Sequence, residues 1–163
     1  MIEKTNARKS TWMRKSLWIL IPLALFVLWW AVPTVNQARL DAQVRELCAK
    51  DGGIKVYETV TLPAEKFNQW GQVNFYRPTQ GENALGSEFI FKEEHIYYQR
   101  GSPEMWRIRY QLFRRSDGKL LGESIGYSRR GGDPIGPWND SSFGCPDNRG
   151  DVPFLSQIFI KIK

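Results

Sequence analysis

Two cysteines, one histidine and a pair of adjacent glutamates are the residues best suited to chemistry in this chain of 163 residues. A nucleophilic Cys48 or Cys145 would need a base, and His95 lies in a strand-like segment without a recognisable partner signature. Outside the cytoplasm two cysteines commonly pair. A Cys48–Cys145 disulfide would close roughly a hundred residues and contribute on the order of 4 kcal/mol in the chain-entropy model. We therefore expect this disulfide, with two separate buried thiols as the alternative.

Glu93 and Glu94 are the residue types of a glycosidase pair. Adjacent strand residues point to opposite faces of a sheet, so these carboxylates would flank one bond only if a bulge realigned them. We expect them to meet Arg107 or Arg109 across the strands, and we predict no catalytic residue. A small envelope enzyme that uses carboxylates stays open as an alternative.

Metal ligands are scarce. One histidine and two cysteines cannot build a standard zinc site without several carboxylates. Four aspartates could ligate calcium, but their spacing does not match an EF-hand loop; they are Asp133, Asp140, Asp147 and Asp151. We predict no metal site and no cofactor.

The elements that position these residues begin with an apolar run at residues 17–35, which carries no charge. A helix of this length nearly matches the roughly 30 Å hydrocarbon core of a bilayer. Trp18 lies at one end and Trp29 and Trp30 near the other, where aromatic rings favour the headgroup layer. We predict a transmembrane helix with these tryptophans at the membrane interfaces, kinked or ended by Pro33.

A basic tail, residues 1–16, precedes this run and carries +4 of the net charge of +6. Lysine and arginine on this flank place the tail in the cytoplasm and the remainder of the chain across the membrane. Because the remainder carries only +2, the basic balance indicates membrane topology, and we expect no nucleic-acid binding.

A cleaved secretory signal and a buried core helix are the two alternatives to a membrane anchor, and the apolar run fits each of them less well. A cleaved secretory signal needs a shorter apolar core and a site of small residues, whereas the nearest candidate, residues 36–38, has a polar residue where a small one is expected. A buried core helix rarely lacks a polar stripe over such a length. We therefore expect a retained signal anchor.

The segment 36–50 continues the helical pattern as a predicted stalk, which a glycine pair at 52–53 ends. Its apolar positions recur at helical spacing and are Leu40, Val44, Leu47 and Cys48. They predict an amphipathic stalk that docks on the following domain. A helix that belongs simply to that domain's core is the alternative.

Residues 51–163 have strand patterns, so we predict an α+β fold in which the two helices precede a small antiparallel sheet. Asp117-Gly118 predicts a two-residue hairpin turn with Ser116 opposite Lys119. Three strands within residues 88–129 would then form a meander, and the alternating tail 154–163 would add an edge strand. In this register Trp106, Ile108, Tyr110 and Leu112 lie opposite Arg129, Tyr127, Ile125 and Glu123, respectively.

The loop 131–151 is long for a compact domain, and such loops are functional or disordered. Trp138 and Phe143 make it a candidate partner-binding surface with an aromatic anchor. The alternative is a disulfide-tied loop whose aromatic rings pack on the sheet.

Four arginines, Arg107, Arg109, Arg129 and Arg130, are further candidates for partner binding. An arginine face would suit anionic lipid headgroups or a cell-wall glycan. The alternative is a solvated face balanced by glutamates.

The segments LCAKDGGIKVYETVTLP and GYSRRGGDPIGPWNDSSFGCP, which contain both cysteines, resemble uncharacterised small membrane-anchored proteins of Gram-negative bacteria. The resemblance implies a bacterial source and a periplasmic domain. We therefore expect a non-enzymatic, single-pass inner-membrane protein that serves as an accessory or interaction subunit of an envelope complex, with a protein partner. A tethered binder of anionic lipid or glycan is the second hypothesis.

Overall fold

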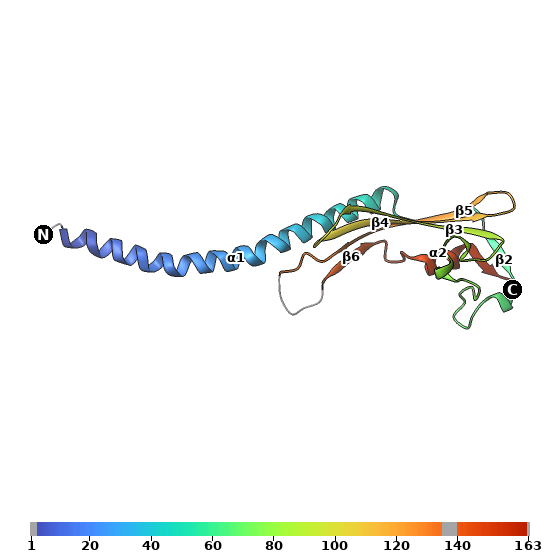
Figure 1. Ribbon diagram of the computed structural model, residues 1–163, viewed down its shortest axis with the longest axis horizontal. Coiled ribbons are helices and arrows are strands. Elements are labelled where there is room, and N and C mark those ends of the chain that lie inside the picture. The colour runs from blue at the N-terminus through green and yellow to red at the C-terminus, as the bar shows by residue number, and fades with distance from the viewer. Residues whose placement is uncertain (1–2, 135–139, 163) are drawn as a thin grey trace.

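The computed structural model describes residues 3–134 and 140–162, with side chains from Trp18 onward. A long helix is followed by a compact sheet domain (Figure 1). The elements in chain order are α1 (Glu3–Asp51), β1 (Gly53–Val56), β2 (Val60–Leu62), η1 (Ala64–Lys66), η2 (Pro78–Asn83), β3 (Phe89–Gln99), β4 (Glu104–Arg114), β5 (Leu120–Arg130), β6 (Ser142–Cys145), α2 (Asp151–Ile158) and β7 (Phe159–Lys161).

The helix α1 joins the predicted membrane span and the predicted stalk in one continuous rod. Pro22 and Pro33 both lie inside it, so Pro33 does not end the helix; prolines are tolerated within membrane-spanning helices. The apolar part, from Trp18, is long and apolar enough to cross a membrane once, and its most apolar stretch is not buried among the described residues. The helix ends at Asp51, next to Gly52 and Gly53, as predicted.

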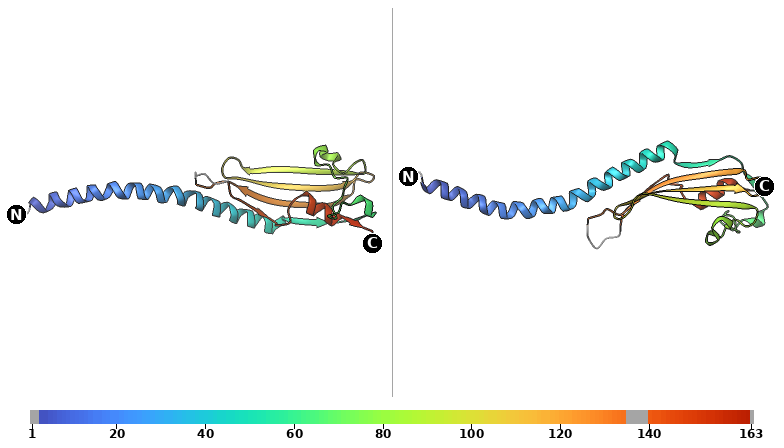
Figure 2. Two further views of the ribbon diagram at one scale, coloured as in Figure 1. Left: turned by 90° about the horizontal axis from the view of Figure 1, so that it is seen from below. Right: turned by 45° about the horizontal axis from the view of Figure 1, so that its top comes forward.

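The main sheet is antiparallel, with strand order β1-β5-β4-β3 and with β6 also paired to β5. Strands β3, β4 and β5 are long and consecutive, which confirms the predicted meander (Figure 2). The α+β prediction, a helix followed by an antiparallel sheet, is therefore confirmed.

The predicted register of the β4–β5 hairpin is wrong by one residue, because Leu112 lies opposite Gly122 and not Glu123. A two-residue type I′ turn needs a positive φ at both Asp117 and Gly118, and only Gly118 has one. Asp117 instead accepts hydrogen bonds from the Arg114 guanidinium and from the Lys119 N–H. The resulting longer turn and a register shift after Leu112 move Ile125 and Tyr127 to the other face of the sheet.

The C-terminal tail also differs from the prediction. Phe154, Leu155 and Ile158 are buried on one side of the short helix α2, and only β7 after it is a strand. Apolar residues at spacings of one, three and four fit a helical period as well as a strand. The strand β7 pairs in parallel with β2, apart from the main sheet.

Two cores lie on opposite faces of the main sheet and are offset along it. The end of α1 covers one face, here called the helix face, and α2 covers the other, here called the core face (Figure 1). The larger core lies toward the β4–β5 turn and consists of Ala84, Leu85, Phe89, Phe91, Tyr110, Leu112, Leu121, Phe154, Leu155, Ile158 and Phe159. The smaller core, under α1, consists of Val44, Cys48, Met105, Ile125 and Tyr127.

Candidate interaction site

The buried, bonded and hydrogen-bonded contacts of the helix α1 with the sheet domain follow one stripe, whose members are three or four residues apart. Its members are Gln37, Asp41, Val44, Cys48 and Asp51. Residues at this spacing share one face of a helix. The stripe is polar at both ends and apolar in the middle, where Val44 is completely buried. Gln37, the first residue of this stripe, lies two residues after Val35, the last residue of the apolar run, and the helix continues unbroken between them, so the apolar segment runs directly into the docked segment.

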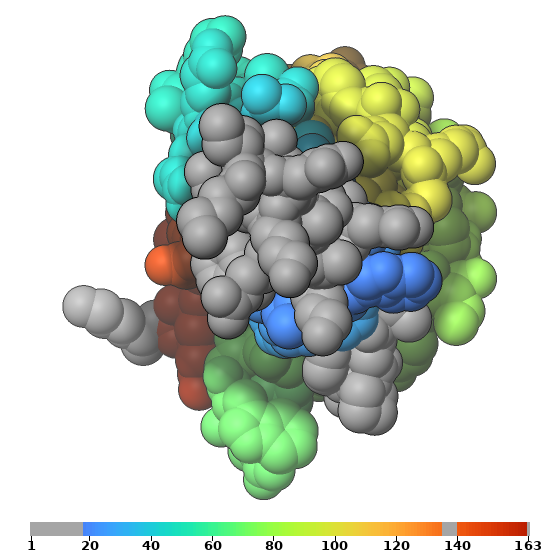
Figure 3. All heavy atoms as spheres, turned by 90° about the vertical axis from the view of Figure 1, so that its left-hand side faces the viewer, coloured from blue at the N-terminus to red at the C-terminus, as the bar shows by residue number. Residues whose placement is uncertain are grey.

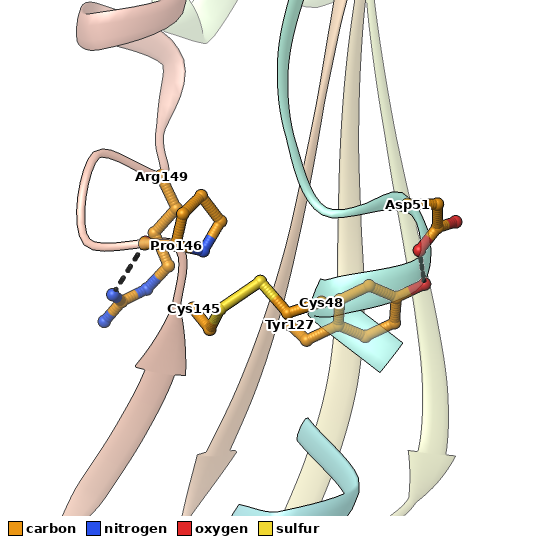
Figure 4. The surroundings of a disulfide bond; sticks show 6 residues. All are labelled: Cys48, Asp51, Tyr127, Cys145, Pro146 and Arg149. Carbon is orange, nitrogen blue, oxygen red and sulfur yellow. Dashed lines mark hydrogen bonds between the residues drawn. A yellow bond between two sulfur atoms is a disulfide. The ribbon is translucent and has the colours of Figure 1, made fainter. Parts of the chain in front are cut away.

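The predicted disulfide is present and fixes the middle of this stripe. Cys48 and Cys145 are bonded with their Cα atoms 6.1 Å apart, which joins α1 to β6 across 97 residues. One helical turn further on, the Tyr127 hydroxyl donates a 2.8 Å hydrogen bond to Asp51 (Figure 4). Burial, reinforced by this hydrogen bond to a carboxylate, raises the pKa of Tyr127 above its ordinary value. The end of the helix is therefore held by one covalent bond and one hydrogen bond.

Arg129, one of the four predicted arginines, is a buried part of the same junction and is only 4% exposed. Its Nε and one terminal nitrogen donate to the two Asp41 carboxylate oxygens at 2.9 and 3.2 Å. Its other terminal nitrogen donates to the Gly131 carbonyl and to Ser141. Both sides of the loop that follows β5 are therefore tied to α1 through one guanidinium.

Gln37 clamps the same loop from the helix. Its amide donates to Asp133 at 2.9 Å and to the Ser141 hydroxyl at 3.1 Å. The Ser141 N–H donates to the other Asp133 oxygen at 2.7 Å, and these hydrogen bonds lower the pKa of Asp133. The base of the loop is thus held at the point where α1 leaves its apolar run.

The three remaining predicted arginines do not form one site with Arg129. Arg109 donates to Glu123 at 2.7 Å on the helix face. Arg107 is half-buried on that face, and its Nε has no hydrogen-bond partner among the described residues. Arg130 is exposed at the end of β5 and belongs to the opposite face.

The two predicted aromatic anchors, Trp138 and Phe143, are not shown to form one site either. Trp138 lies outside the described residues. Phe143 is half-buried beside the smaller core, and the Arg45 guanidinium lies 5.1 Å from its ring centroid. Phe143 therefore packs on the junction between helix and sheet.

Glu93 and Glu94 point to opposite faces of β3, as expected for neighbouring strand residues. Glu93 contacts His95 at 2.8 Å and lies opposite Tyr110, whereas Glu94 lies opposite Arg109, which is paired with Glu123. The two carboxylates therefore lie on different faces of the strand, although both border one open pocket beside η2 together with Glu82 and Arg109. Among residues 18–134 and 140–162, no three acidic, histidine or cysteine side chains are grouped so that they could hold a metal ion.

The end of the sheet next to the apolar helix is here called the near end. It comprises the β3–β4 turn, residues 100–103, and the loop base, residues 131–133 and 141. The Ser102 hydroxyl accepts a 3.0 Å hydrogen bond from Gly132, so turn and loop base are in contact. Figure 3, viewed from the anchor end, shows the turn region (yellow) exposed beside the end of the sheet-bound helix (cyan).

Exposed aromatic and apolar side chains gather on β3 toward the near end, a feature that sequence reasoning missed. Ile96, Tyr97 and Tyr98 are 37%, 42% and 48% exposed. The Tyr97 ring lies 6.2 Å from the Trp106 ring and 4.7 Å from the Arg100 guanidinium. In the sequence, strict alternation ends at residues 92–95, a pattern that indicates a bulge there; the register shift lies later in the strand, between Tyr97 and Gln99.

The comparisons with known proteins find no significant match among protein-family models, curated proteins or solved structures. The arrangement of the chain's own residues must therefore carry any functional conclusion. That arrangement is an apolar helix, unburied among the described residues, that joins without a break a sheet whose edge strand β3 exposes the side chains of residues 96–98 near it.

Proposed function

We propose that this chain is a single-pass inner-membrane protein of a Gram-negative envelope, with its N-terminus in the cytoplasm and its sheet domain in the periplasm. It acts as a non-enzymatic accessory subunit that presents a binding surface at a fixed height above the membrane. The observation that carries this proposal is the continuous helix α1, which is uncovered in its apolar part and locked to the sheet from Gln37 to Asp51.

The height of the near end follows from the helix geometry. Gln37 is two residues beyond the apolar run, a rise of about 3 Å. The headgroup layer on each side of a bilayer is roughly 5–8 Å thick. The clamp from Gln37 to Asp133 and Ser141 therefore sets the near end at the membrane surface.

Several observations support this topology and this role over the alternatives. The net charge of +4 on residues 1–16 favours a cytoplasmic tail, and a disulfide favours an oxidising compartment. Arg129 is buried against Asp41 and Arg109 is paired with Glu123, which leaves little of a shared arginine face for lipid or glycan. The opposed directions of Glu93 and Glu94 weigh against a carboxylate enzyme.

Helical residues inserted between Val35 and Asn36 test whether partner binding requires the domain to lie at a fixed height above the membrane. Seven inserted residues lift the domain by about 10 Å with nearly unchanged rotation. Photo-crosslinks from the near end to a partner in the native membrane should then be lost, although the domain keeps its disulfide. A matched substitution of seven apolar residues within the span, which changes no length, should keep them. Crosslinks that survive the insertion unchanged would contradict the proposal.

A further inference from the structure

The outer edge of β3 carries no further strand among the described residues: η2 lies beside it at residues 91–94, and the edge is open from His95 toward the near end. Backbone groups along it have no backbone partner among the described residues beyond those of β4. We propose that this edge, centred on Glu93, His95 and Tyr97, binds an extended segment of a different membrane protein by strand addition. This inference rests on the proposed function, of which it names the binding surface and the chemistry of the partner.

The direction of the backbone groups follows from the hydrogen-bond pattern. The Arg115 N–H bonds to the Glu88 carbonyl, so the pair 88/115 exchanges hydrogen bonds across β3 and β4. Along an antiparallel ladder, pairs that exchange hydrogen bonds alternate with pairs that do not. Even-numbered residues of β3 therefore point their N–H and C=O groups at β4. Those of Glu93, His95 and Tyr97 point outward, over a span of about 13 Å from the first to the last.

The side chains divide this edge into two halves. Toward the near end lie Ile96, Tyr97 and Tyr98, each more than a third exposed. Further from the membrane lie the exposed carboxylates of Glu93 and Glu94, and the Glu94 carboxylate has no ion pair or hydrogen bond among the described residues. An unpaired carboxylate beside an open edge favours a lysine or arginine on the added strand.

A second copy of this chain does not fit the edge. Strands β3 to β5 run along nearly the same direction as α1 (Figures 1 and 2). An antiparallel pair of β3 edges has a two-fold axis perpendicular to the strands, so it would send the two anchors in opposite directions. A parallel pair of β3 edges would have its two-fold axis along the strands. The same residue of each copy would then lie at the same height, so that N–H would face N–H and C=O would face C=O. A parallel ladder instead needs the two strands to be offset by one residue.

The occupant is therefore a heterologous chain anchored in the same membrane. Its extended segment carries aromatic or β-branched residues close to the membrane and a basic residue about three or four positions further out. Backbone hydrogen bonds would supply affinity, and the alternating side chains specificity. Charges at Glu93 and Glu94 and the shift after Tyr97 limit self-aggregation at this edge.

Proline at His95 tests strand addition while sparing the fold. It removes an outward N–H that β4 does not use, and proline is accepted at such edge positions. The full-length protein would carry p-benzoylphenylalanine at Tyr97 and be photolysed in the membranes of the cells that produce it. We expect an adduct whose yield falls roughly tenfold or more with His95→Pro, since a carbonyl of the added strand loses its donor. His95→Ala should retain the adduct.

Further variants and measurements distinguish the possible outcomes. Retention of the Cys48–Cys145 disulfide and of protease resistance reports that His95→Pro has folded, and Glu93→Pro, also outward-facing, is the second variant. Equal adduct yields with proline and alanine, or an adduct of twice the 18.9 kDa chain mass, would overturn strand addition by a heterologous partner. Reporters at Tyr57 and Val152 separate the two proposals. Adducts only from these would overturn the β3 assignment alone, whereas no adduct from any reporter would overturn the proposed function too.

Discussion

Asp41 of the anchor helix and Arg129 of the central strand β5, 88 residues apart in sequence, form an ion pair through two hydrogen bonds of 2.9 and 3.2 Å. The Arg129 side chain is only 5% exposed. The pair joins the helix to the sheet within about one turn of the Gln37 clamp. It therefore couples the position of the apolar part of α1 to the position of the sheet.

Removal of the Asp41 carboxylate should destabilise the domain strongly. Asp41→Ala leaves a buried guanidinium without its counter-charge, which costs on the order of 3 kcal/mol. Pulse proteolysis of the full-length protein in detergent, across a urea series, measures the loss. Glu46→Ala is the matched control, because Glu46 forms an exposed ion pair with Lys50 on the same helix and should show no measurable change. Equal stability of the two variants would mean that Arg129 does not depend on Asp41.

Loss of the disulfide should destabilise the domain through a different route. Cys48→Ala with Cys145→Ala frees 97 residues of the unfolded chain, worth about 4–5 kcal/mol in the chain-entropy model. The same urea series on oxidised and reduced wild-type protein should reproduce this difference. If reduction leaves the urea midpoint unchanged, the stripe on α1 docks without covalent help.

Two glycines on the core face should respond differently to alanine. A Cβ at Gly122 would lie 2.8 Å from Ile158 and 2.9 Å from the Lys55 carbonyl oxygen, neither of which can move freely. The nearest atoms to a Cβ at Gly144 would belong to the end of the exposed Arg149 side chain, at 2.5 Å. Gly122→Ala should therefore lower the free energy of unfolding by about 1–3 kcal/mol, and Gly144→Ala by much less. Thermal melts of both variants check this order; the reverse order would contradict the packing of α2 on β5.

Acid should weaken the helix face through Glu123. Burial raises the pKa of this carboxyl, but hydrogen bonds from Arg109 and Tyr57 outweigh burial and lower the pKa below its ordinary value of 4.5. The stabilisation is therefore complete above the unfolded-state pKa and is lost as the pH falls through the lower folded-state pKa. Between pH ~5 and ~3 the urea midpoint of wild type should fall more steeply than that of Glu123→Gln. Parallel slopes would mean that Glu123 is not held in its charged form.

The sequence was informative where one physical signal dominated. An uncharged run flanked by basic residues predicted the long apolar helix, and two lone cysteines predicted the bond between Cys48 and Cys145. The first signal lies within one segment of the sequence. The second leaves a single possible pairing, because the chain has only two cysteines. The α+β architecture followed from them and from the strand patterns.

The strand register and the burial of individual side chains were harder to predict from the sequence, because they depend on contacts between residues that are distant in sequence. Asp117-Gly118 favours a tight turn, yet the side chain of Asp117 pairs with Arg114 and the turn is longer. That one-residue change moved Tyr127 under α1, where it reaches Asp51. Arg129 looked like a surface cation for the same reason, since nothing near it in sequence indicated Asp41 as its partner.

The central claim is that the membrane span and the sheet domain form one rigid unit. Double electron–electron resonance between spin-labelled amino acids at Leu25 and Lys119, in lipid nanodiscs, tests it while the native disulfide stays intact. The account predicts a single narrow distance distribution near ~50 Å, the sum of the helical rise to Gln37 and the length of β4. A broad distribution, spread over ~20 Å or more, would show a hinge between anchor and domain and would contradict the account.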